Sequence, residues 1–185
     1  QDILEQVSAQ FRPANGHWTG IAARSTVFAY NKDKLTDADL PKTMAELAEP
    51  QWQGRWAASP SGADFQAIVA AYLALEGEKA TLGWLKGMAE NAVIVRGNRT
   101  ALAAANNGEV DGALIYHYYW FGDQAGTKEN SEHAALHYFG NEDPGAFVSI
   151  SGGGVLASSQ HKEEAEAFLR FITGERGQAV LRDGT

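Results

Sequence analysis

Short apolar runs alternate along the chain with segments in which apolar residues recur every three or four positions. The runs are rich in β-branched and aromatic residues, as in Thr26-Val27-Phe28-Ala29-Tyr30, which is typical of buried strands. On this basis we expect strands at 26–30, 54–58, 92–95, 110–115, 135–139 and 147–150. Strands that alternate with helices predict an α/β fold with helices on both faces of one sheet.

The first helical segments have recognisable ends. A short helix is expected near 44–48, because Thr43-Met44-Ala45-Glu46 fits a capping box and Pro50 stops the helix. The next helix follows Ser61-Gly62-Ala63-Asp64 and ends near Gly77. In the plain structural interpretation of that start, Ser61 is the N-cap and Asp64 occupies the third helical position.

Further helical segments complete the pattern. One carries Leu82, Leu85 and Met88, and an alanine-rich helix is expected at 100–106. Ser159 is expected to cap a last amphipathic helix, whose apolar stripe consists of Ala165, Phe168, Leu169 and Ile172.

Composition narrows the possible classes of protein. The 185 residues carry a formal net charge of −8 and include no cysteine. An acidic chain without a basic stripe is poorly suited to nucleic acid, and the absence of cysteine excludes disulfide scaffolds, zinc fingers and thiol nucleophiles. No stretch reaches the roughly 18–20 apolar residues that span a bilayer, so we expect no membrane insertion. The start lacks a signal-peptide pattern and an initiator Met, which is the expectation for an excised or mature piece.

Small, polar or phenolic residues stand at three predicted junctions between a strand and a helix. These are Ser61–Asp64, Asn98–Thr100 and Tyr118-Tyr119. In open α/β sheets ligands bind outside the carboxyl ends of strands, where helix N-termini suit an anion. The pattern therefore predicts a crevice with an anion subsite beside two phenols.

The Tyr118-Tyr119 doublet has two interpretations. It can belong to an aromatic core cluster, which is the commoner case for a doublet alone. It can also be a metal site, because phenolate is a hard anionic donor that suits a hard trivalent cation. Both phenols reach one ion only if the backbone turns there from strand into helix, since neighbours in a strand point to opposite faces.

Other motifs are weaker. Ser151-Gly152-Gly153-Gly154 lacks the ending of a phosphate loop and is interpreted as a bend or hinge. His133 and His137 lie in a segment expected to be extended, about 13 Å apart, too far for one ion. They are interpreted as surface histidines, and no nucleophile elbow, Ser-His-Asp order or HExxH supports an enzyme.

Several motifs together, in order along the whole chain, resemble those of the periplasmic ferric-ion-binding proteins, the substrate-binding components of bacterial iron ABC transporters. The residues that carry this resemblance are Ala23–Val27, Tyr30-Asn31, Pro50–Arg55, Trp84–Gly87, Asn107–Asp111, Tyr118–Trp120, Asp143–Ala146 and Gly174–Gln178. The resemblance implies a class II periplasmic-binding-protein-like lobe, with a mixed sheet flanked by helices and crossover strands to a largely missing first lobe.

The resemblance also implies a site. Tyr118 and Tyr119 match the tyrosine doublet that ligates Fe³⁺ in the family. A synergistic anion, phosphate or carbonate, is expected at Ser61, Gly62, Ala63 and Asn98. Asp64 departs from the small residue usual at its position, and its charge would repel the anion.

The resemblance begins well inside the family's chain. The implied division is a first-lobe remnant with a crossover strand at 1–29, the second lobe at 30–144, and a return crossover with a partial first-lobe segment at 145–185. The part that is missing supplies the remaining protein ligands in the family, typically a histidine and a carboxylate.

The function implied is capture of Fe³⁺ in the periplasm by a monomer and its delivery to an inner-membrane ABC permease, without turnover. A competing interpretation is the same fold binding another solute, such as a polyamine, thiamine, sulfate or phosphonate, although these ligands need no paired phenolates. A second competing interpretation is an α/β enzyme, and a third is a stand-alone interaction domain.

Overall fold

A computed structural model describes residues 2–140 and 142–184, which pack as two units. Unit 1 combines the residues up to Arg24 with those from Ser149 onward, and unit 2 runs from Ser25 to Val148. The division implied by the sequence has its boundaries between residues 29 and 30 and between residues 144 and 145, each within five residues of the observed boundaries. That unit 2 corresponds to a second lobe, and unit 1 to part of a first, stays a prediction.

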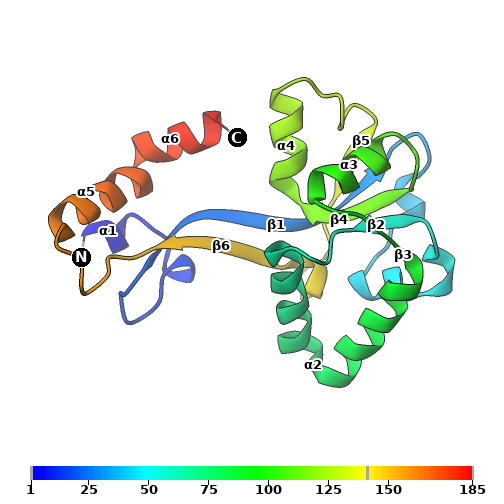
Figure 1. Cartoon of the computed structure of the whole chain (residues 1–185), viewed down its shortest axis with the longest axis horizontal. Helices are drawn as coiled ribbons and strands as arrows, with labels where there is room; N and C mark the ends of the chain where they lie inside the picture. Colours follow the sequence, from blue (N-terminus) through cyan, green and yellow to red (C-terminus); the bar gives the residue numbers. More distant parts are fainter. Residues whose placement is uncertain (1, 141, 185) are drawn as a thin grey trace. The chain divides into compact units, whose positions relative to one another are not determined.

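The sheet is mixed, as predicted. Strands β3 (Ala92–Ile94), β2 (Trp56–Ala58), β4 (Gly112–Tyr116), β1 (Thr19–Asn31) and β5 (Ala134–His137) lie in that order. β2 is parallel to β3 and β4, whereas β1 is antiparallel to β4 and β5. β6 (Val148–Gly153) pairs with β1, and the two strands run side by side in Figure 1. Each predicted strand is present, with ends shifted by a few residues, and β1 is much longer than expected.

Helices α2, α3 and α4 belong to unit 2, and α1, α5 and α6 belong to unit 1. Their bounds are α1 (Asp2–Glu5), α2 (Ala63–Asn91), α3 (Asn98–Asn106), α4 (His117–Ala125), α5 (Lys162–Thr173) and α6 (Glu175–Asp183). Short 3-10 helices lie at η1 (Ala9–Phe11), η2 (Asp37–Asp39), η3 (Met44–Ala48), η4 (Pro50–Trp52) and η5 (Pro144–Ala146). None of the described helices combines the length and the apolar composition needed to cross a membrane.

Two hydrophobic clusters cover the two faces of the sheet in unit 2. Along β1, Phe28 belongs to the cluster that includes α2, whereas Val27 and Ala29 belong to the cluster that includes α3. β4 behaves in the same way, since Leu114 and Ile115 are both buried but belong to different clusters. Alternate side chains of a strand point to opposite faces, so a sheet covered on both faces needs continuous apolar runs.

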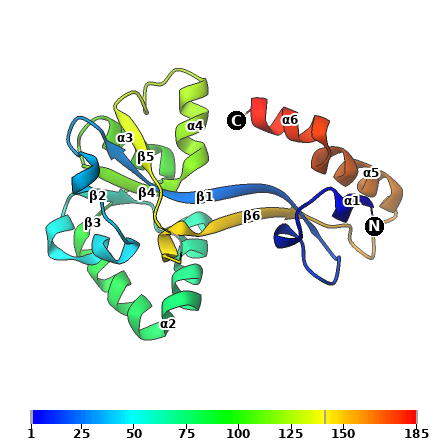
Figure 2. The ribbon, with the colours of Figure 1, turned by 180° about the vertical axis from the view of Figure 1, so that it is seen from behind.

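α2 is two helices that meet at Gly77. Its φ of 79° and ψ of 171° interrupt the helix, and Figure 2 shows the bend. A positive φ is tolerated by glycine because it has no Cβ atom. The predicted helix end near Gly77 and the second helix beyond it are confirmed.

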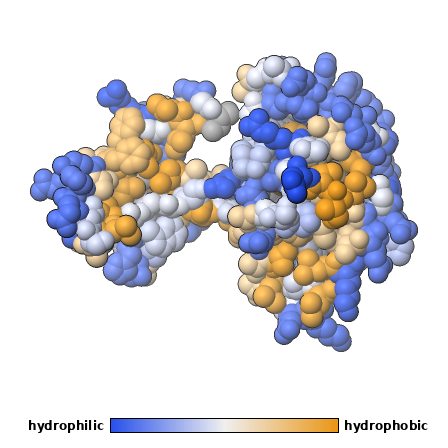
Figure 3. Space-filling model, viewed as in Figure 1, coloured by the Kyte–Doolittle hydropathy of each residue, from blue (hydrophilic) through white to orange (hydrophobic). Residues whose placement is uncertain are grey.

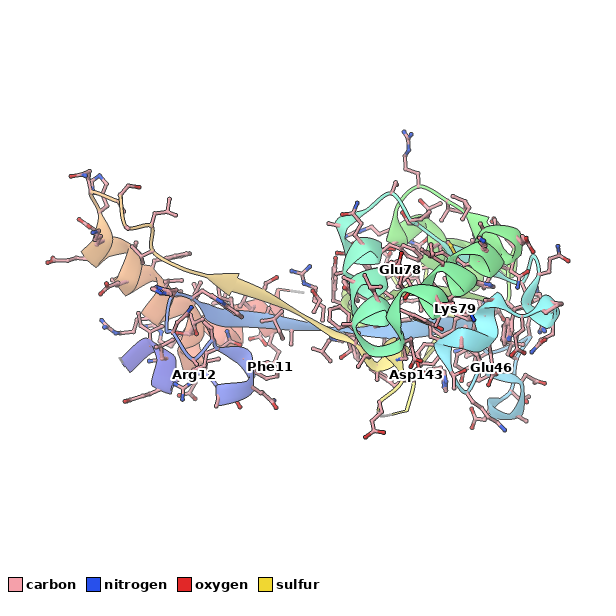
Figure 4. The ribbon with its side chains drawn as sticks, turned by 90° about the horizontal axis from the view of Figure 1, so that it is seen from below. Phe11, Arg12, Glu46, Glu78, Lys79 and Asp143 are labelled. Carbon is pink, nitrogen blue, oxygen red and sulfur yellow. The ribbon has the colours of Figure 1, made fainter. Side chains whose placement is uncertain are left out.

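The cap predicted at Ser159 is wrong, and the capping box predicted at Thr43 is not formed. Thr43 is the N-cap of the 3-10 helix η3, at the predicted position, but it makes no side-chain capping bond. Both carboxylate oxygens of Asp143, a residue labelled in Figure 4, accept a hydrogen bond from the backbone N–H of Met44, at 3.1 and 3.3 Å. Ser159 does not cap the last helices either, because α5 begins at Lys162 and the Ser159 hydroxyl accepts from the N–H of His161.

The glycine-rich stretch is not a bend. Ser151 to Gly153 belong to β6. A Cβ atom at Gly152 would lie 2.7 Å from the ring of Trp18, so close approach of this side chain explains the glycine. The sequence pattern also predicted no separate helix for α6.

Unit 1 carries large apolar side chains at its surface, and both hydrophobic clusters lie in unit 2. Figure 3 shows hydrophobic residues gathered over α5 and α6. The exposed residues there include Phe168, Phe171 and Val180, with exposed fractions of 61%, 48% and 65%.

Candidate functional site

The tyrosine doublet lies on the first turn of α4, directly after β4. Tyr116 is the last residue of β4 and the N-cap of α4, so the backbone turns from strand into helix immediately before Tyr118 and Tyr119. Both side chains are half-buried, and their ring centroids lie 4.1 Å apart with an interplanar angle of 30°. Helical neighbours differ in direction by about 100° rather than 180°, so the two phenols lie on the same part of the surface.

The start of α2 differs from the expected one. The N-cap is Gly62, without a side-chain capping bond, and helix α2 begins at Ala63. Ser61 is exposed and precedes the cap, so the plain interpretation with Ser61 as the N-cap is wrong. Asp64 is therefore the second residue of the helix. A carboxylate in the first turn interacts favourably with the helix dipole.

Asp64 joins the three predicted junctions. Its Oδ2 atom accepts a hydrogen bond from the Tyr119 hydroxyl at 3.1 Å and another from the Asn98 amide at 3.0 Å. Its backbone carbonyl accepts from the Tyr116 hydroxyl at 3.3 Å. The structure thus brings together the starts of α2, α3 and α4. In the sequence, Asp64 stands out only because its charge would repel an anion at the predicted subsite. The helices α2, α3 and α4 follow the neighbouring strands β2, β3 and β4, and this is the signal that could have placed Asp64 between the three helix starts.

Asn98 is the first residue of α3. The cap is Gly97, whose φ of 96° favours glycine, and helix α3 begins two residues earlier than predicted. The backbone N–H of Gly97 donates to the Ser59 hydroxyl at 2.9 Å. This bond holds the start of α3 next to the segment that follows β2, and it leaves the Asn98 amide directed at Asp64.

The donor set at these helix starts consists of oxygen atoms. Phenols from Tyr118 and Tyr119 and the carboxylate of Asp64 are hard donors, which hard cations prefer. Within residues 2–140 and 142–184, no group of three His, Cys, Asp or Glu side chains could hold a metal ion.

The histidines do not form a chelating pair. The Nδ1 atom of His133 lies 2.7 Å from Asp33, whereas the Nε2 atom of His137 lies 2.8 Å from the carbonyl oxygen of Pro41. His133 is exposed as expected, but His137 is half-buried. His117 accepts a hydrogen bond from the backbone N–H of Ser25 at its Nδ1 atom. Burial lowers the pKa of the His117 imidazole.

Two cavities, of about 260 and 300 Å³, lie in unit 1. Residues from α1, β1, β6, α5, α6 and the chain between α1 and β1 line them, and none of the predicted site residues is among these. The predicted crevice beside the tyrosines is thus not one of these cavities.

Comparison with known proteins matches the whole chain. A family profile described as bacterial extracellular solute-binding protein covers residues 2–185. An Fe(3+)-binding periplasmic protein of Serratia marcescens is 62% identical over 179 residues, which are 97% of this chain and 53% of that protein. The major ferric iron-binding protein of Neisseria meningitidis is 39% identical over 91% of this chain and 51% of its own length.

Solved structures agree with the fold. Iron-bound HitA from Pseudomonas aeruginosa superposes with a TM-score of 0.89 at 41% identity, over 97% of this chain and 58% of that chain. The chain spans about half the length of the curated relatives it matches. The resemblance to ferric-ion-binding proteins and the periplasmic-binding-protein-like fold are confirmed. The chain belongs to the bacterial extracellular solute-binding protein family.

Proposed function

We propose that this chain binds Fe³⁺ through the phenolate oxygens of Tyr118 and Tyr119, as part of a periplasmic iron-uptake system. The contact of Tyr119 with Asp64 is the observation that carries the proposal. It places a carboxylate beside the phenols at the joint start of three helices. The names of the relatives support the choice of ion, since those proteins are ferric-ion-binding.

The hydrogen bond between Tyr119 and Asp64 suits a site that exchanges a proton for a metal. A phenol has an ordinary pKa of about 10, and it must lose its proton to become a ligand. When the Tyr119 proton leaves to solvent, its bond to Asp64 is lost as well. Both oxygen atoms are then negatively charged and adjacent, which a trivalent cation stabilises.

The resemblance to ferric-ion-binding proteins implies a synergistic phosphate or carbonate at Ser61, Gly62, Ala63 and Asn98, beside the iron. Asp64 restricts it, because the Asn98 amide already donates to the Asp64 carboxylate. An anion would have to displace that carboxylate and would meet its charge. We therefore propose that Asp64 supplies the oxygen donor that an anion would otherwise supply, and that an anion binds at this position only when the carboxylate is removed.

Delivery of the ion to an inner-membrane ABC permease and action as a monomer complete the proposed function. The solute-binding family supports a role in capture rather than in catalysis. Capture needs reversible binding, and phenolate ligands allow it because protons compete with the metal for the same oxygen atoms.

Removal of single phenols tests the proposal. Tyr118→Phe and Tyr119→Phe should each weaken Fe³⁺ binding by about 100-fold or more, since even outer partners of metal ligands are worth about 10- to 100-fold. Tyr138→Phe is the matched control, because Tyr138 is an exposed tyrosine of unit 2 outside the site. Affinity is measured by competition with citrate. Equal affinities for all three variants and the unmodified chain would exclude the tyrosine pair as the iron site.

A further inference from the structure

His117, the first residue of α4, makes a hydrogen bond that the proposed coordination does not use. Its Nδ1 atom accepts the backbone N–H of Ser25 in β1, with 3.0 Å between the two nitrogen atoms. The antiparallel pairing of β1 with β4 runs from Tyr30↔Gly112 to Thr26↔Tyr116. Ser25 is thus one position past the last pair, where the partner chain has already turned into α4. The imidazole satisfies a backbone donor that β4 no longer reaches.

The His117 ring is held on a second side as well. It is half-buried and meets the ring of Phe121, one helical turn later, with centroids 5.7 Å apart and an interplanar angle of 76°. Because Nδ1 accepts the hydrogen bond, the proton of the neutral ring is on Nε2. The ring is therefore fixed both to β1 and to its own helix.

This attachment matters because the start of α4 lacks the usual capping groups. Its N-cap, Tyr116, makes no side-chain capping bond, and its first turn contains no acidic residue. Capping groups normally stabilise the first turn of a helix and set how the chain enters it. Here that turn carries Tyr118 and Tyr119, so the direction in which it leaves β4 decides where both phenols point.

We propose that His117 is a positioning residue for the tyrosine pair. By accepting the N–H of Ser25, it holds the first residue of α4 against β1 and so keeps the two phenols in the arrangement that binds one ion. It acts through the tyrosines and is not itself a ligand. The inference rests on the proposed function.

A pair of isosteric variants isolates the hydrogen bond. His117→Asn places an amide oxygen close to the position of Nδ1, whereas His117→Leu has nearly the same shape and no acceptor. Both lose the ring contact with Phe121, so the difference between them reports the acceptor alone. Phe121→Leu measures the ring contact separately, and His133→Leu removes an exposed imidazole from another part of unit 2.

Each variant is titrated with Fe³⁺ in competition with citrate, and the tyrosinate-to-iron absorbance per bound iron is recorded together with thermal unfolding. His117→Leu should bind Fe³⁺ about 2- to 10-fold more weakly than His117→Asn, which is the range expected for the loss of one hydrogen bond. Its tyrosinate-to-iron absorbance per bound iron should also be weaker. His133→Leu should match the unmodified chain. If His117→Leu does not fold, His117→Phe takes its place, because it keeps an aromatic ring beside Phe121 without an acceptor.

The outcomes separate the two proposals. Equal Fe³⁺ affinities and equal tyrosinate-to-iron absorbance for His117→Asn and His117→Leu would overturn the positioning role of His117 while leaving the proposed iron site intact. Absence of any tyrosinate band in the unmodified chain would overturn the proposed function, and the positioning role with it.

Discussion

The hydroxyl of Tyr119 donates a hydrogen bond to the carboxylate of Asp64 over 3.1 Å, although 55 positions separate the two residues in the chain. The contact joins the first turn of α4 to the first turn of α2. A half-buried carboxylate is costly unless it is paired or hydrogen-bonded, and Asp64 obtains this compensation from the phenol and from Asn98. The same geometry places hard oxygen atoms side by side, which is what the proposed iron site requires.

Replacement of Asp64 tests how the site uses an anion. For the unmodified chain, Fe³⁺ affinity should change little when phosphate is added. Asp64→Asn should bind Fe³⁺ about 10- to 100-fold more weakly without phosphate and should recover much of this loss when phosphate is present. Asp64→Ala should bind phosphate more tightly than the unmodified chain in the absence of iron, because a repelling charge is removed.

Asp33→Asn is the matched control, since Asp33 is an exposed carboxylate that pairs with His133 away from these helix starts. Isothermal titration with and without phosphate measures all four proteins. A strict requirement for phosphate in the unmodified chain would show that Asp64 does not replace the anion.

Much of the fold could be predicted from sequence because local patterns determine it. The run Ala113–Tyr116 is apolar on both faces and so predicts a buried strand. The bend at Gly77 follows in the same way from an interruption of helical periodicity. These features depend on neighbours within a few residues.

What sequence could not supply depends on residues that are distant in the chain. The hydrogen bonds of Asp64 come from Asn98 and Tyr119, 34 and 55 positions away. The backbone N–H of Met44 donates to Asp143, 99 positions away, whereas Thr43, the N-cap of this helix, makes no side-chain capping bond. Gly152 belongs to strand β6, and a Cβ atom there would collide with Trp18, a contact that no local glycine pattern reveals.

Asp111 gives unit 2 a dependence on pH. Burial raises the pKa of this carboxyl, but hydrogen bonds and charges from Lys34 and Arg55 outweigh burial and lower the pKa below its ordinary value. The two ion pairs measure 2.8 and 2.6 Å. Because the folded-state pKa lies below the unfolded one, the stabilisation is complete at neutral pH and is lost as pH falls below about 4 through the folded-state value.

Asp111→Asn should therefore lower the free energy of unfolding by about 1–3 kcal/mol at pH 7, the usual cost of losing hydrogen bonds to a charged group. The difference from the unmodified chain should shrink towards zero in acid below the folded-state pKa. Urea unfolding between pH 3 and about 7 checks this. A difference that stays constant over that range would contradict the assigned role of the carboxylate.

The phenyl ring of Phe28 in β1 lies against Gly112, whose partner in the pairing of β4 with β1 is Tyr30. A Cβ atom at Gly112 would lie 2.2 Å from the phenyl ring, so Gly112→Ala forces the ring or the strand to move. We expect a loss of about 1–3 kcal/mol in the free energy of unfolding. Gly83→Ala is the control, because a Cβ atom there meets no atom within 4 Å and alanine favours the helix by about 1 kcal/mol. Equal stabilities of the two variants would show that the core yields at Phe28.

Resonance Raman spectroscopy of the iron-loaded chain tests the central claim most directly, because excitation in a tyrosinate-to-iron band enhances only the ring modes of tyrosines that ligate the metal. We predict enhanced tyrosinate modes in the unmodified chain and in Tyr138→Phe. The modes should be weaker in the single variants Tyr118→Phe and Tyr119→Phe and absent from the double variant. Tyrosinate modes that persist in the double variant, or that never arise in the unmodified chain under Fe³⁺, would contradict the assignment of iron to this pair.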